Sequence, residues 1–581
     1  MITEEELIKK LMKNQIDYNI FIKFNSSTAL EKTSLANLIR KAISSGYIQK
    51  TDGNLLRVTK EGRQYINRLE GKEEAVKTSK LIRVNVNSKD AKTDSSIIAK
   101  AYNIKFDFAN ELLKSAEEIS NKCYFENIES DRQDFRNIKT ITIDSEASKD
   151  LDDAFSIEKT DDNNYKVYIH ISDVSHFIEF NSPLDLEARK RGNSVYLIDK
   201  VYNMFPEILS NNIISLNENA DRFALTIIVY MDNKGEILSS SVCKSIIKSD
   251  RKLSYNYAEK LIKKEEKDED WLSELLDNAL SIKNILRKKR MEGRGIEFDN
   301  NDIKIVLNDD GIPIEFCAEV KKESMSIVEE LMILANSEIA EKLSDYDGVI
   351  YRCHGLPDEY RFNNFKILAH NKGYDLKQFK DNSYDIKGFI DNIKGKPEEN
   401  LLISVLLRSM TPSSYSIINK SHFGLGFDNY TYFTSPIRRY ADLLIHRIVK
   451  DTILSNKDTI DEKLKEISRN SVESLSFLDK NSRKAERYII QIKAARYMKD
   501  RLGEEYYGVI SSISHKGIYV AIEGLEIEGF IESFYIGADY RFYQDMQSVY
   551  INKIKTYELG DRLKVLVASA NTENGKILFS L

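Results

Sequence analysis

The segment that most constrains the fold of this chain is "DSEASKDLDDAFS", residues 144–156. It places four aspartates, Asp144, Asp150, Asp152 and Asp153, within ten positions between two apolar segments. Together with its flanks the region predicts a strand, an acidic loop, a strand, a turn and a further strand. Carboxylates held close together repel one another and resist ionisation unless a cation joins them or water separates them. The loop is therefore either solvated or a metal site.

The type of ligand decides which metal such a loop could hold. Carboxylate oxygens without cysteine or histidine nearby favour magnesium or manganese over zinc. Asp152 and Asp153 are neighbours and would point to opposite sides of a strand, so the backbone must bend if both are to face one site. A loop of aspartates is more commonly just solvated, and the spacing alone leaves both interpretations open.

Composition narrows the class of protein. The 581 residues suffice for about four domains, and 41% hydrophobic with 31% charged residues is typical of a folded soluble protein. The start, "MITEEELIKK", lacks the apolar core of a signal peptide, and the apolar runs are too short to span a membrane, so we expect a cytoplasmic protein. The four cysteines lie far apart, which favours reduced thiols over a zinc site or disulfides.

The net charge of −6 gives no support to nucleic-acid binding when it is averaged over the whole chain. Charge can nevertheless be segregated within a chain, and a cluster of acidic metal ligands itself contributes to the negative total. The average charge therefore excludes neither nucleic acid nor any other partner.

Residues 1–70 predict a winged helix-turn-helix. Apolar residues recur at helical spacing from Leu35 to Ile43, and "YIQKTDGNLLRVT" alternates around an Asp-Gly turn, which indicates a hairpin. Such a module contacts nucleic acid or docks on another protein, and both uses stay open. The candidate phosphate contacts are Arg40, Lys41, Lys50 and Arg57. Residues 71–136 are predicted to form a linker and a helical connector, and a helix is expected in "DFANELLKSAEEIS".

Residues 501–581 alternate apolar and polar positions in short runs separated by turn residues, which predicts a closed five-stranded barrel. The order of the runs resembles the S-one type of OB-fold, which binds single strands by stacking bases on aromatic rings. The candidate stacking residues are Tyr519, Phe530, Phe534 and Tyr543, and each is equally compatible with the barrel core.

The central block, residues 137–500, contains the most specific sequence motifs of the chain. The segments "TIDSEASKDLDDAFS", "IHISDVSHFI", "NSVYLID", "YRCHGLP", "HFGLGFDNYTYFTSPIRRYADLLIHR" and "RKAERY" follow one another in the order found in the RNase II / RNase R family. With the barrel, the resemblance covers roughly three quarters of the chain. It implies a magnesium-dependent, hydrolytic, processive exoribonuclease that degrades single-stranded RNA from the 3′ end and releases nucleoside 5′-monophosphates.

The resemblance also implies roles for individual residues. Asp144, Asp150, Asp152 and Asp153 match the family's catalytic acidic quartet, which would hold two magnesium ions, with manganese as a possible substitute, and Asp152 is expected to be the least replaceable. Arg438 matches the arginine near the scissile phosphate, although it could form a structural salt bridge, and Arg439 could exchange roles with it. Tyr196 matches an aromatic that stacks on the terminal base, with core packing as the alternative. Glu486 matches an acid near the RNA end, with a plain ion pair as the alternative.

The chain departs from the family pattern in one place. Residues 75–137 leave no space for the usual pair of cold-shock barrels, and we expect the winged helix to take their place at the RNA entrance. The expected fold is α+β and multidomain: a winged helix-turn-helix, a mixed α/β RNB catalytic domain over 137–500 and a five-stranded OB-fold barrel. We expect a monomer that binds single-stranded RNA. The alternatives are a catalytically silent RNA-binding regulator and a DNA-binding regulator that acts through residues 1–70.

Overall fold

The structure is a computed structural model in which the chain divides into two units, Met1–Arg83 and Val84–Leu581. It describes residues 90–581 except 123, 126–127, 297–301, 380–383 and 544–546. Before residue 90 it describes only residues 16–17, 35–36, 38–40, 42–43, 48–50 and 55–59. Among the described helices, none combines the length and the apolar character needed to span a bilayer.

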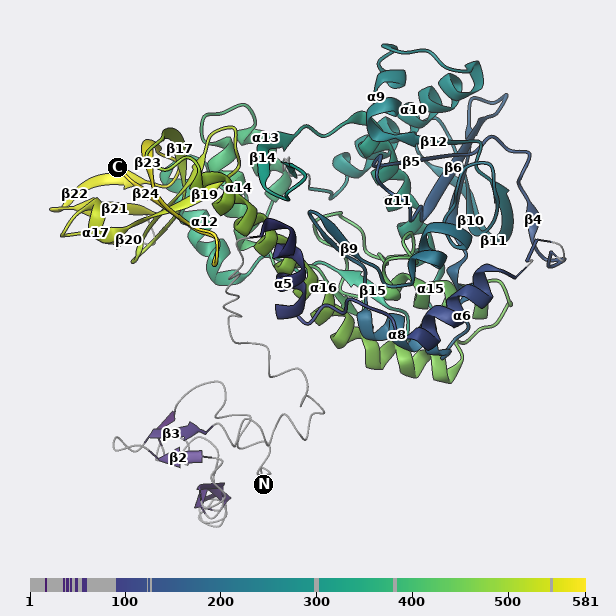
Figure 1. Cartoon of the computed structure of the whole chain (residues 1–581), viewed down its shortest axis with the longest axis horizontal. Helices are drawn as coiled ribbons and strands as arrows, with labels where there is room; N and C mark the ends of the chain where they lie inside the picture. Colours follow the sequence, from purple (N-terminus) through teal and green to yellow (C-terminus); the bar gives the residue numbers. More distant parts are fainter. Residues whose placement is uncertain are drawn as a thin grey trace. The chain divides into compact units, whose positions relative to one another are not determined.

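The described part of the first unit is a small sheet beside helical residues. The strands β1 (Ile16–Asp17), β2 (Ile48–Lys50) and β3 (Leu55–Val58) pair in the order β1-β3-β2 (Figure 1). The antiparallel pairing of β2 with β3 confirms the predicted hairpin. Leu35, Ile39 and Ala42 are buried, as their helical spacing predicts. Arg40 is exposed, whereas Lys41 and the side chains of Lys50 and Arg57 lie outside the described residues, so the winged helix stays a prediction.

A seven-stranded sheet forms the centre of the second unit. Its order is β12-β5-β6-β7-β10-β11-β4, and its neighbours are antiparallel except β12 beside β5 and β4 beside β11. Nearly every residue of β7 is buried, which fits a strand covered on both faces. The strands are β4 (Gln133–Asp134), β5 (Ile141–Asp144), β6 (Asp153–Lys159), β7 (Tyr165–Ser172), β10 (Asp221–Met231), β11 (Ile237–Lys248) and β12 (Arg251–Ser254).

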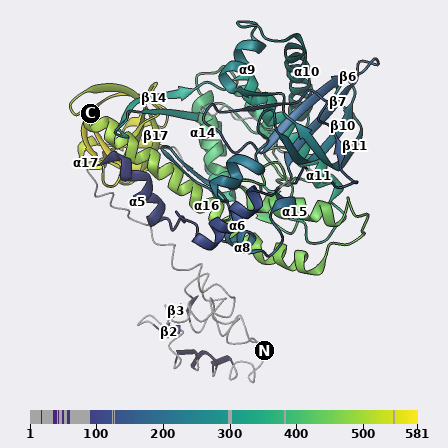
Figure 2. The ribbon, with the colours of Figure 1, turned by 45° about the vertical axis from the view of Figure 1, so that its right-hand side comes forward.

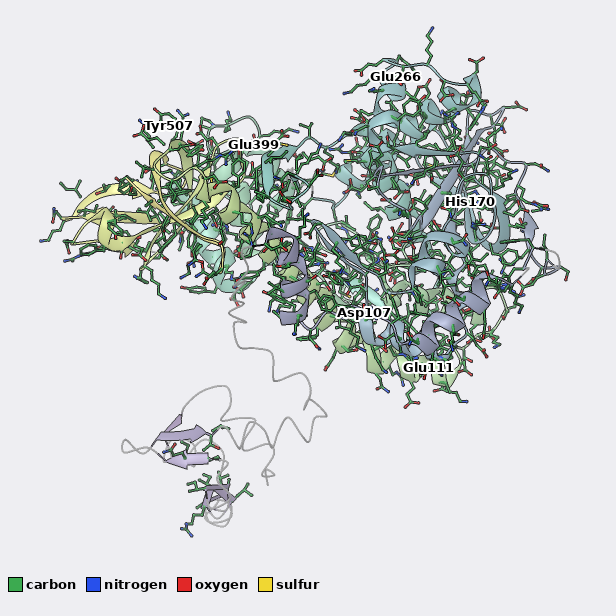
Figure 3. The ribbon with its side chains drawn as sticks, viewed as in Figure 1. Asp107, Glu111, His170, Glu266, Glu399 and Tyr507 are labelled. Carbon is green, nitrogen blue, oxygen red and sulfur yellow. The ribbon has the colours of Figure 1, made fainter. Side chains whose placement is uncertain are left out.

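Three helices pack beside this sheet: α9 (Tyr255–Ile262), α10 (Asp270–Glu292) and α11 (Glu323–Lys342) (Figure 1). The sheet interior also holds a buried histidine, His170, which Figure 3 labels among the strands. Its Nδ1 lies 2.8 Å from the Thr226 hydroxyl and its Nε2 lies 3.2 Å from the Ser156 hydroxyl. Burial lowers the pKa of His170 to about 3. The imidazole is therefore neutral and links three adjacent strands without placing a charge in the core.

The longest helix, α16 (Glu462–Lys499), connects the central region with the barrel (Figures 1 and 2). The connector helix α5 (Asp94–Ala101) packs on it, and α6 (Asn110–Ser120) packs against α8 (Pro183–Arg191). Helix α6 confirms the helix expected in "DFANELLKSAEEIS". In the described part of residues 90–136 the chain forms helices and the short strand β4, and no barrel.

The C-terminal region confirms the predicted closed five-stranded barrel, with strand order β17-β18-β19-β24-β23. Gly529 is required where two strands approach closely, because a Cβ atom there would lie 2.3 Å from the ring of Phe579. A three-stranded sheet, which the sequence pattern did not reveal, is inserted between β19 and β23. The strands are β17 (Glu505–Ser514), β18 (Gly517–Ile522), β19 (Glu528–Glu532), β23 (Arg562–Asn571) and β24 (Lys576–Ser580), with β20 (Arg541–Tyr543), β21 (Ser548–Ile551) and β22 (Ile554–Glu558) in the insertion.

The remaining elements connect these parts. They are η2 (Ala91–Thr93), α7 (Val174–Phe177), β8 (Val195–Leu197), β9 (Lys200–Tyr202), η3 (Leu209–Ile213), β13 (Asp302–Leu307), β14 (Pro313–Glu319), β15 (Tyr351–Cys353), α12 (Glu359–Asn371), α13 (Ile386–Ile393), α14 (Glu399–Ser409), β16 (Ser414–Ser416), α15 (Tyr440–Asp451) and α17 (Ser533–Ile536). The cysteines Cys243, Cys317 and Cys353 are free thiols, as their wide spacing predicts, and Cys123 lies outside the described residues.

A buried ionic cluster fastens the connector to α16. Asp94 and Lys493 are both inaccessible to solvent, and their side chains lie 3.1 Å apart. Arg496 also pairs with Asp94, at 2.6 Å. The Lys493 ammonium donates to the backbone carbonyls of Ala91 and Gly311, each at 2.8 Å. Lys493 therefore holds together three segments that are far apart in the sequence.

We expect Lys493→Met to lower the free energy of unfolding by about 3–5 kcal/mol, because it leaves Asp94 and two carbonyls buried with fewer partners. Chemical denaturation followed by circular dichroism measures this change. The exposed Lys499 on the same helix provides the control, since Lys499→Met is expected to change stability by less than about 0.5 kcal/mol. Equal stabilities of the two variants would contradict the structural role given to Lys493.

Candidate active site

The four aspartates line one cavity of about 490 Å³. The two neighbouring strands and the loop that carry the aspartates explain why the four carboxylates lie close together. Asp144 ends β5 and Asp153 begins β6, which is the neighbouring strand, while Asp150 and Asp152 lie in the loop between them. Asp152 precedes the first residue of β6, so it escapes the alternation that would send it away from Asp153. The structure thus brings together all four carboxylates that the sequence singled out.

Asp152 is the most firmly held of the four carboxylates. It is 4% exposed, and its Oδ1 accepts a hydrogen bond from the backbone N–H of Ile437 at 2.8 Å. Its own carbonyl accepts from the N–H of Ser172, at the end of β7, at 2.9 Å. Its Oδ2 is buried without a hydrogen-bond partner and lies 3.4 Å from Nε of Arg438. One oxygen is therefore anchored and the other is left for a further positive partner.

Burial and mutual repulsion disfavour ionisation in this cavity. Burial is the largest cause that raises the pKa of Asp144 to about 8, and the charges of Asp153 and Asp150 add to it. Burial raises the pKa of Asp153 to about 6, opposed by the arginines at 438 and 439. The pKa of Asp152 also lies well above its usual value because of burial. Three of the four acids thus lack sufficient positive charge around them.

The donor set fits a hard divalent cation. All candidate ligands are carboxylate oxygens, and Asp144 Oδ2 and Asp152 Oδ2 are buried without hydrogen-bond partners. A cation would relieve the repulsion that raises the pKa values. Within the described residues, no three acidic, histidine or cysteine side chains are gathered closely enough to chelate an ion by themselves. Water and phosphate oxygens would have to complete the coordination, as is usual for magnesium.

The two neighbouring arginines have different surroundings. Arg438 is 42% exposed on its side chain and points to the aspartates, with Nη2 donating to the Ser435 hydroxyl at 2.9 Å. Arg439 is 18% exposed, pairs with Asp442 at 2.7 Å and stacks on the Tyr432 ring, with the guanidinium carbon 3.9 Å from the ring centre. Both side chains line the cavity, but Arg438 is the one next to Asp152.

Tyr196 and Glu486 belong to a second, smaller cavity beside the first. This cavity of about 190 Å³ shares Tyr196, Arg438 and Arg439 with the acidic cavity, whereas Glu486 lines only the smaller one. The Tyr196 hydroxyl donates to Asp150 Oδ2 at 2.7 Å, and 39% of the residue is exposed. Burial is the main cause that raises the pKa of Glu486. Tyr196 is therefore not a core residue and stands between the two cavities.

Sequence reasoning missed several residues of the acidic cavity. Tyr255, at the start of α9, and Glu329 and Asn336, on α11, also line it. Burial and the nearby charges of Asp144 and Asp153 raise the pKa of the Tyr255 hydroxyl. These residues lie far from the aspartates in the sequence and belong to no acidic or basic cluster. Only the pairing of β12 with β5 brings Tyr255, which follows β12, next to Asp144.

Hydrogen bonds from α15 hold the segment that carries Ile437 and Arg438 in position. Asp442 Oδ1 accepts from the N–H of Ser435 at 2.9 Å. One turn later, His446 lies against the Phe433 carbonyl with its Nε2 at 2.8 Å, and the two rings stack with centres 4.1 Å apart. Burial lowers the pKa of His446 to about 4, and its Nδ1 has no hydrogen-bond partner. The neutral ring therefore carries its proton on Nε2 and donates it to Phe433.

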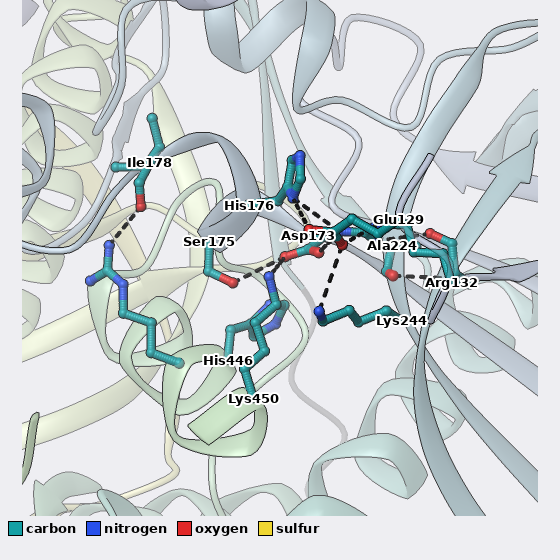
Figure 4. A network of polar contacts seen from close by, with 12 residues as sticks. Glu129, Arg132, Asp173, Ser175, His176, Ile178, Ala224, Lys244, His446 and Lys450 are labelled. Carbon is teal, nitrogen blue, oxygen red and sulfur yellow. Dashed lines mark hydrogen bonds and ion pairs between the residues drawn. The ribbon is translucent and has the colours of Figure 1, made fainter. Parts of the chain in front are cut away.

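The same helix is tied to the strand next to Asp152. Lys450, one turn beyond His446, pairs with the buried Asp173 at 2.5 Å, and Arg132 pairs with Asp173 at 2.8 Å (Figure 4). These two cations hold the pKa of Asp173 well below its usual range against the effect of burial. Asp173 directly follows Ser172, whose N–H contacts Asp152. Helix α15 thus fixes the arginine segment relative to the strand that supports Asp152.

Aromatic side chains lie on the surface of the barrel. Tyr519 and Phe530 face each other across β18 and β19, with ring centres 4.6 Å apart, and Tyr519 is 39% exposed. Phe534, on α17, and Tyr543, on β20 of the inserted sheet, are also exposed but lie outside the five barrel strands. The exposed rings can contact a partner outside the barrel. The sequence alone did not decide whether these aromatic side chains lie in the barrel core or on its surface.

The comparisons with known proteins agree on one family. The RNB domain family model matches residues 132–455. Ribonuclease R 1 and Ribonuclease R 2 of Lactococcus lactis subsp. lactis are 34% and 35% identical over 81% and 82% of the chain, which spans 59% and 73% of their lengths. The structure of Mycoplasma genitalium RNase R with ribose methylated single-stranded RNA superposes with a TM-score of 0.81 at 24% identity, covering 85% of this chain and 78% of that one. Yeast Ssd1, a pseudonuclease, superposes with a TM-score of 0.63 at 18% identity, covering 79% and 58%.

The fold and these matches define the class of protein as one built around an RNB domain. The chain belongs to the RNase II / RNase R family of exoribonucleases.

We expect Asp144→Asn to stabilise the protein in the presence of a chelator, and more so at about pH 9 than at about pH 5. An unfolded aspartate has a pKa near about 3.9, and the folded value is about 8. Between these values the folded chain binds more protons, so its stability falls as the pH rises. Thermal melts of both proteins across pH measure the difference. A constant difference at all pH values would contradict the assigned repulsion.

We expect His446→Leu to lower kcat roughly 10- to 100-fold with little change in KM, because the arginine segment loses a buried anchor. His446→Gln keeps an N–H donor and is expected to retain most of the activity. Steady-state kinetics of both variants, compared with their circular dichroism spectra, separate positioning from misfolding. Equal losses in both variants would show that the hydrogen bond to Phe433 is not what matters.

Proposed function

We propose that this chain is a processive, hydrolytic 3′–5′ exoribonuclease that degrades single-stranded RNA to nucleoside 5′-monophosphates. The observation that carries this proposal is the complete set of four aspartates in one cavity with Arg438 beside Asp152. The curated relatives are named Ribonuclease R, and the superposing RNase R structure contains single-stranded RNA. Activity in RNA decay or processing follows from this class of reaction.

We propose that Asp144, Asp150, Asp152 and Asp153 hold two divalent cations, with magnesium as the physiological ion and manganese as a substitute. Bound there, the cations would activate water, neutralise the scissile phosphate and stabilise the leaving 3′ oxygen. The unpaired, buried oxygens of Asp144 and Asp152 support this assignment. Because Ile437 fixes the other oxygen of Asp152, this carboxylate needs no reorganisation when an ion binds.

The protein's own groups would bind and orient the RNA. Arg438 is exposed enough to pair with phosphate oxygens through its guanidinium. Arg439 lies next to it and remains paired with Asp442. Tyr196 stands where a terminal base could stack at the boundary of the two cavities, and Glu486 would meet the strand in the smaller cavity. Tyr519 and Phe530 offer stacking surfaces on the barrel for bases further upstream.

A catalytically silent RNA-binding protein is the second candidate, because the pseudonuclease Ssd1 has the same fold. The presence of all four aspartates argues against it, since a protein without catalysis has no need to keep four repelling acids in one buried cavity.

We expect the wild-type protein with magnesium to convert 5′-labelled RNA into a short limit product without accumulating intermediates, as a processive enzyme does, and to release a labelled mononucleotide at once from 3′-labelled RNA. Asp152→Asn is expected to lower kcat by at least about 10²-fold, because it removes a fixed negative ligand. The exposed Asp277, on α10, serves as the matched control, and Asp277→Asn should leave the activity unchanged.

Thin-layer chromatography of the products identifies 5′-monophosphates. RNA binding without any magnesium-dependent loss of RNA by the wild-type protein would favour the silent regulator. Full activity of Asp152→Asn would show that the acidic cavity is not the catalytic centre.

A further inference from the structure

One side of a short stretch of α16 is exposed, whereas its other side packs against the connector and β8, with Asn481 Nδ2 donating to the Tyr102 carbonyl and Ser482 buried beside Asn193. N-terminal to this stretch, the Ser476 hydroxyl accepts from the backbone N–H of Tyr415 in β16 at 3.1 Å. C-terminal to it, Gln491 lies against the turn between β23 and β24, where a Cβ atom on Gly575 would be 3.1 Å from the Gln491 Cβ. Residues 480–487 therefore span the interval between the central region and the barrel (Figure 1).

Four cations occupy the exposed side of this interval. Lys480, Arg483, Lys484 and Arg487 are all exposed, and their spacing of three, four and seven residues places them on one face of the helix. We call these four residues the α16 basic stripe. Among the described residues, Arg483 pairs with Asp479 at 3.2 Å, whereas Lys480, Lys484 and Arg487 form no ion pair. The stripe thus carries positive charge that the protein itself does not neutralise.

The α16 basic stripe adjoins the smaller of the two cavities of the candidate active site. Arg483 lines the 190 Å³ cavity together with Glu486, and that cavity shares Tyr196 and Arg438 with the acidic cavity. The Lys480–Arg487 interval spans about 10 Å along the helix axis at 1.5 Å per residue. A polyanion that lies on the stripe would therefore reach the aspartates through the smaller cavity, which three arginines line together with Asp479 and Glu486.

We propose that the α16 basic stripe binds the phosphodiester backbone of single-stranded RNA upstream of the scissile bond, between the barrel and the cavities. The inference rests on the proposed exoribonuclease function and identifies where the incoming strand runs. Lysine is depleted at the cores of protein–protein interfaces, and phosphate contacts through lysine and arginine are the usual source of affinity for nucleic acids. The described part of residues 90–136 forms helices and a short strand and no barrel, so within residues 90–136 no barrel competes with the stripe for the incoming strand.

The test compares two triple variants that remove the same number of charges. The stripe variant carries Lys480→Gln, Lys484→Gln and Arg487→Gln. The control variant carries Lys263→Gln, Lys288→Gln and Arg469→Gln, whose exposed side chains lie directly after α9, on α10 and on the first half of α16. Arg483 is left intact in both because it lines the smaller cavity and pairs with Asp479.

We expect the stripe variant to raise KM for an oligoribonucleotide of about 20 nucleotides roughly 10- to 30-fold, with kcat unchanged. A tetranucleotide that fills only the cavities should show wild-type KM. The slope of log K against log salt for the long RNA should fall by about 2, since each lost phosphate contact removes about 0.7. The control variant should match the wild type in all three measurements.

Binding is measured separately by fluorescence anisotropy with both triples built on Asp152→Asn, in chelator, so that no turnover is needed. An unchanged KM and salt slope in the stripe variant overturn the proposal, as does an equal effect in the control variant. An equal rise in KM for the tetranucleotide shows that the stripe acts on the cavities and also overturns it. If the wild-type protein degrades no RNA, the proposed function fails, and the anisotropy data alone decide whether the stripe binds RNA.

Discussion

The interaction on which the site depends is the repulsion among four carboxylates in a cavity that offers them too little positive charge. Asp152 is anchored on one oxygen by the Ile437 N–H, and Arg438 approaches the other at 3.4 Å. The nearby cations Lys252, Arg438 and Arg439 do not balance the four carboxylates, and the raised pKa of Asp144 and of Asp153 reflects the deficit. The cluster of carboxylates therefore lowers the stability of the folded protein unless further cations are bound.

The position of the aspartates relative to the arginine depends on buried polar contacts from α15. Asp442, His446 and Lys450 follow one another at intervals of four residues and so lie along one face of the helix. They reach Ser435, Phe433 and Asp173, which belong to the two segments that flank Asp152. A single helix thus holds both sides of the site in position relative to each other.

Local patterns predicted much of this molecule. The alternation in residues 501–581 gave the barrel, and the acidic loop between two strands predicted that Asp144 and Asp153 meet, because adjacent strands bring their ends together. The resemblance to a family added Arg438. Tyr255, Asn336 and His446 could not be predicted, since their roles come from pairing and packing between segments far apart in the chain. The inserted sheet of β20, β21 and β22 was missed because its polar strands lack a clear alternation.

The length of α16 has a consequence for the end product of the proposed reaction. The helix has 38 residues, about 57 Å of continuous backbone, and it packs on the barrel at one end while lining the smaller cavity in its middle. A helix of this kind acts as a ruler, because it keeps the barrel at a constant separation from the aspartates. In the proposed reaction, an RNA remnant too short to bridge that separation would lose its contact with the barrel or with the cavity, so the length of α16 would set the size of the smallest tightly bound fragment.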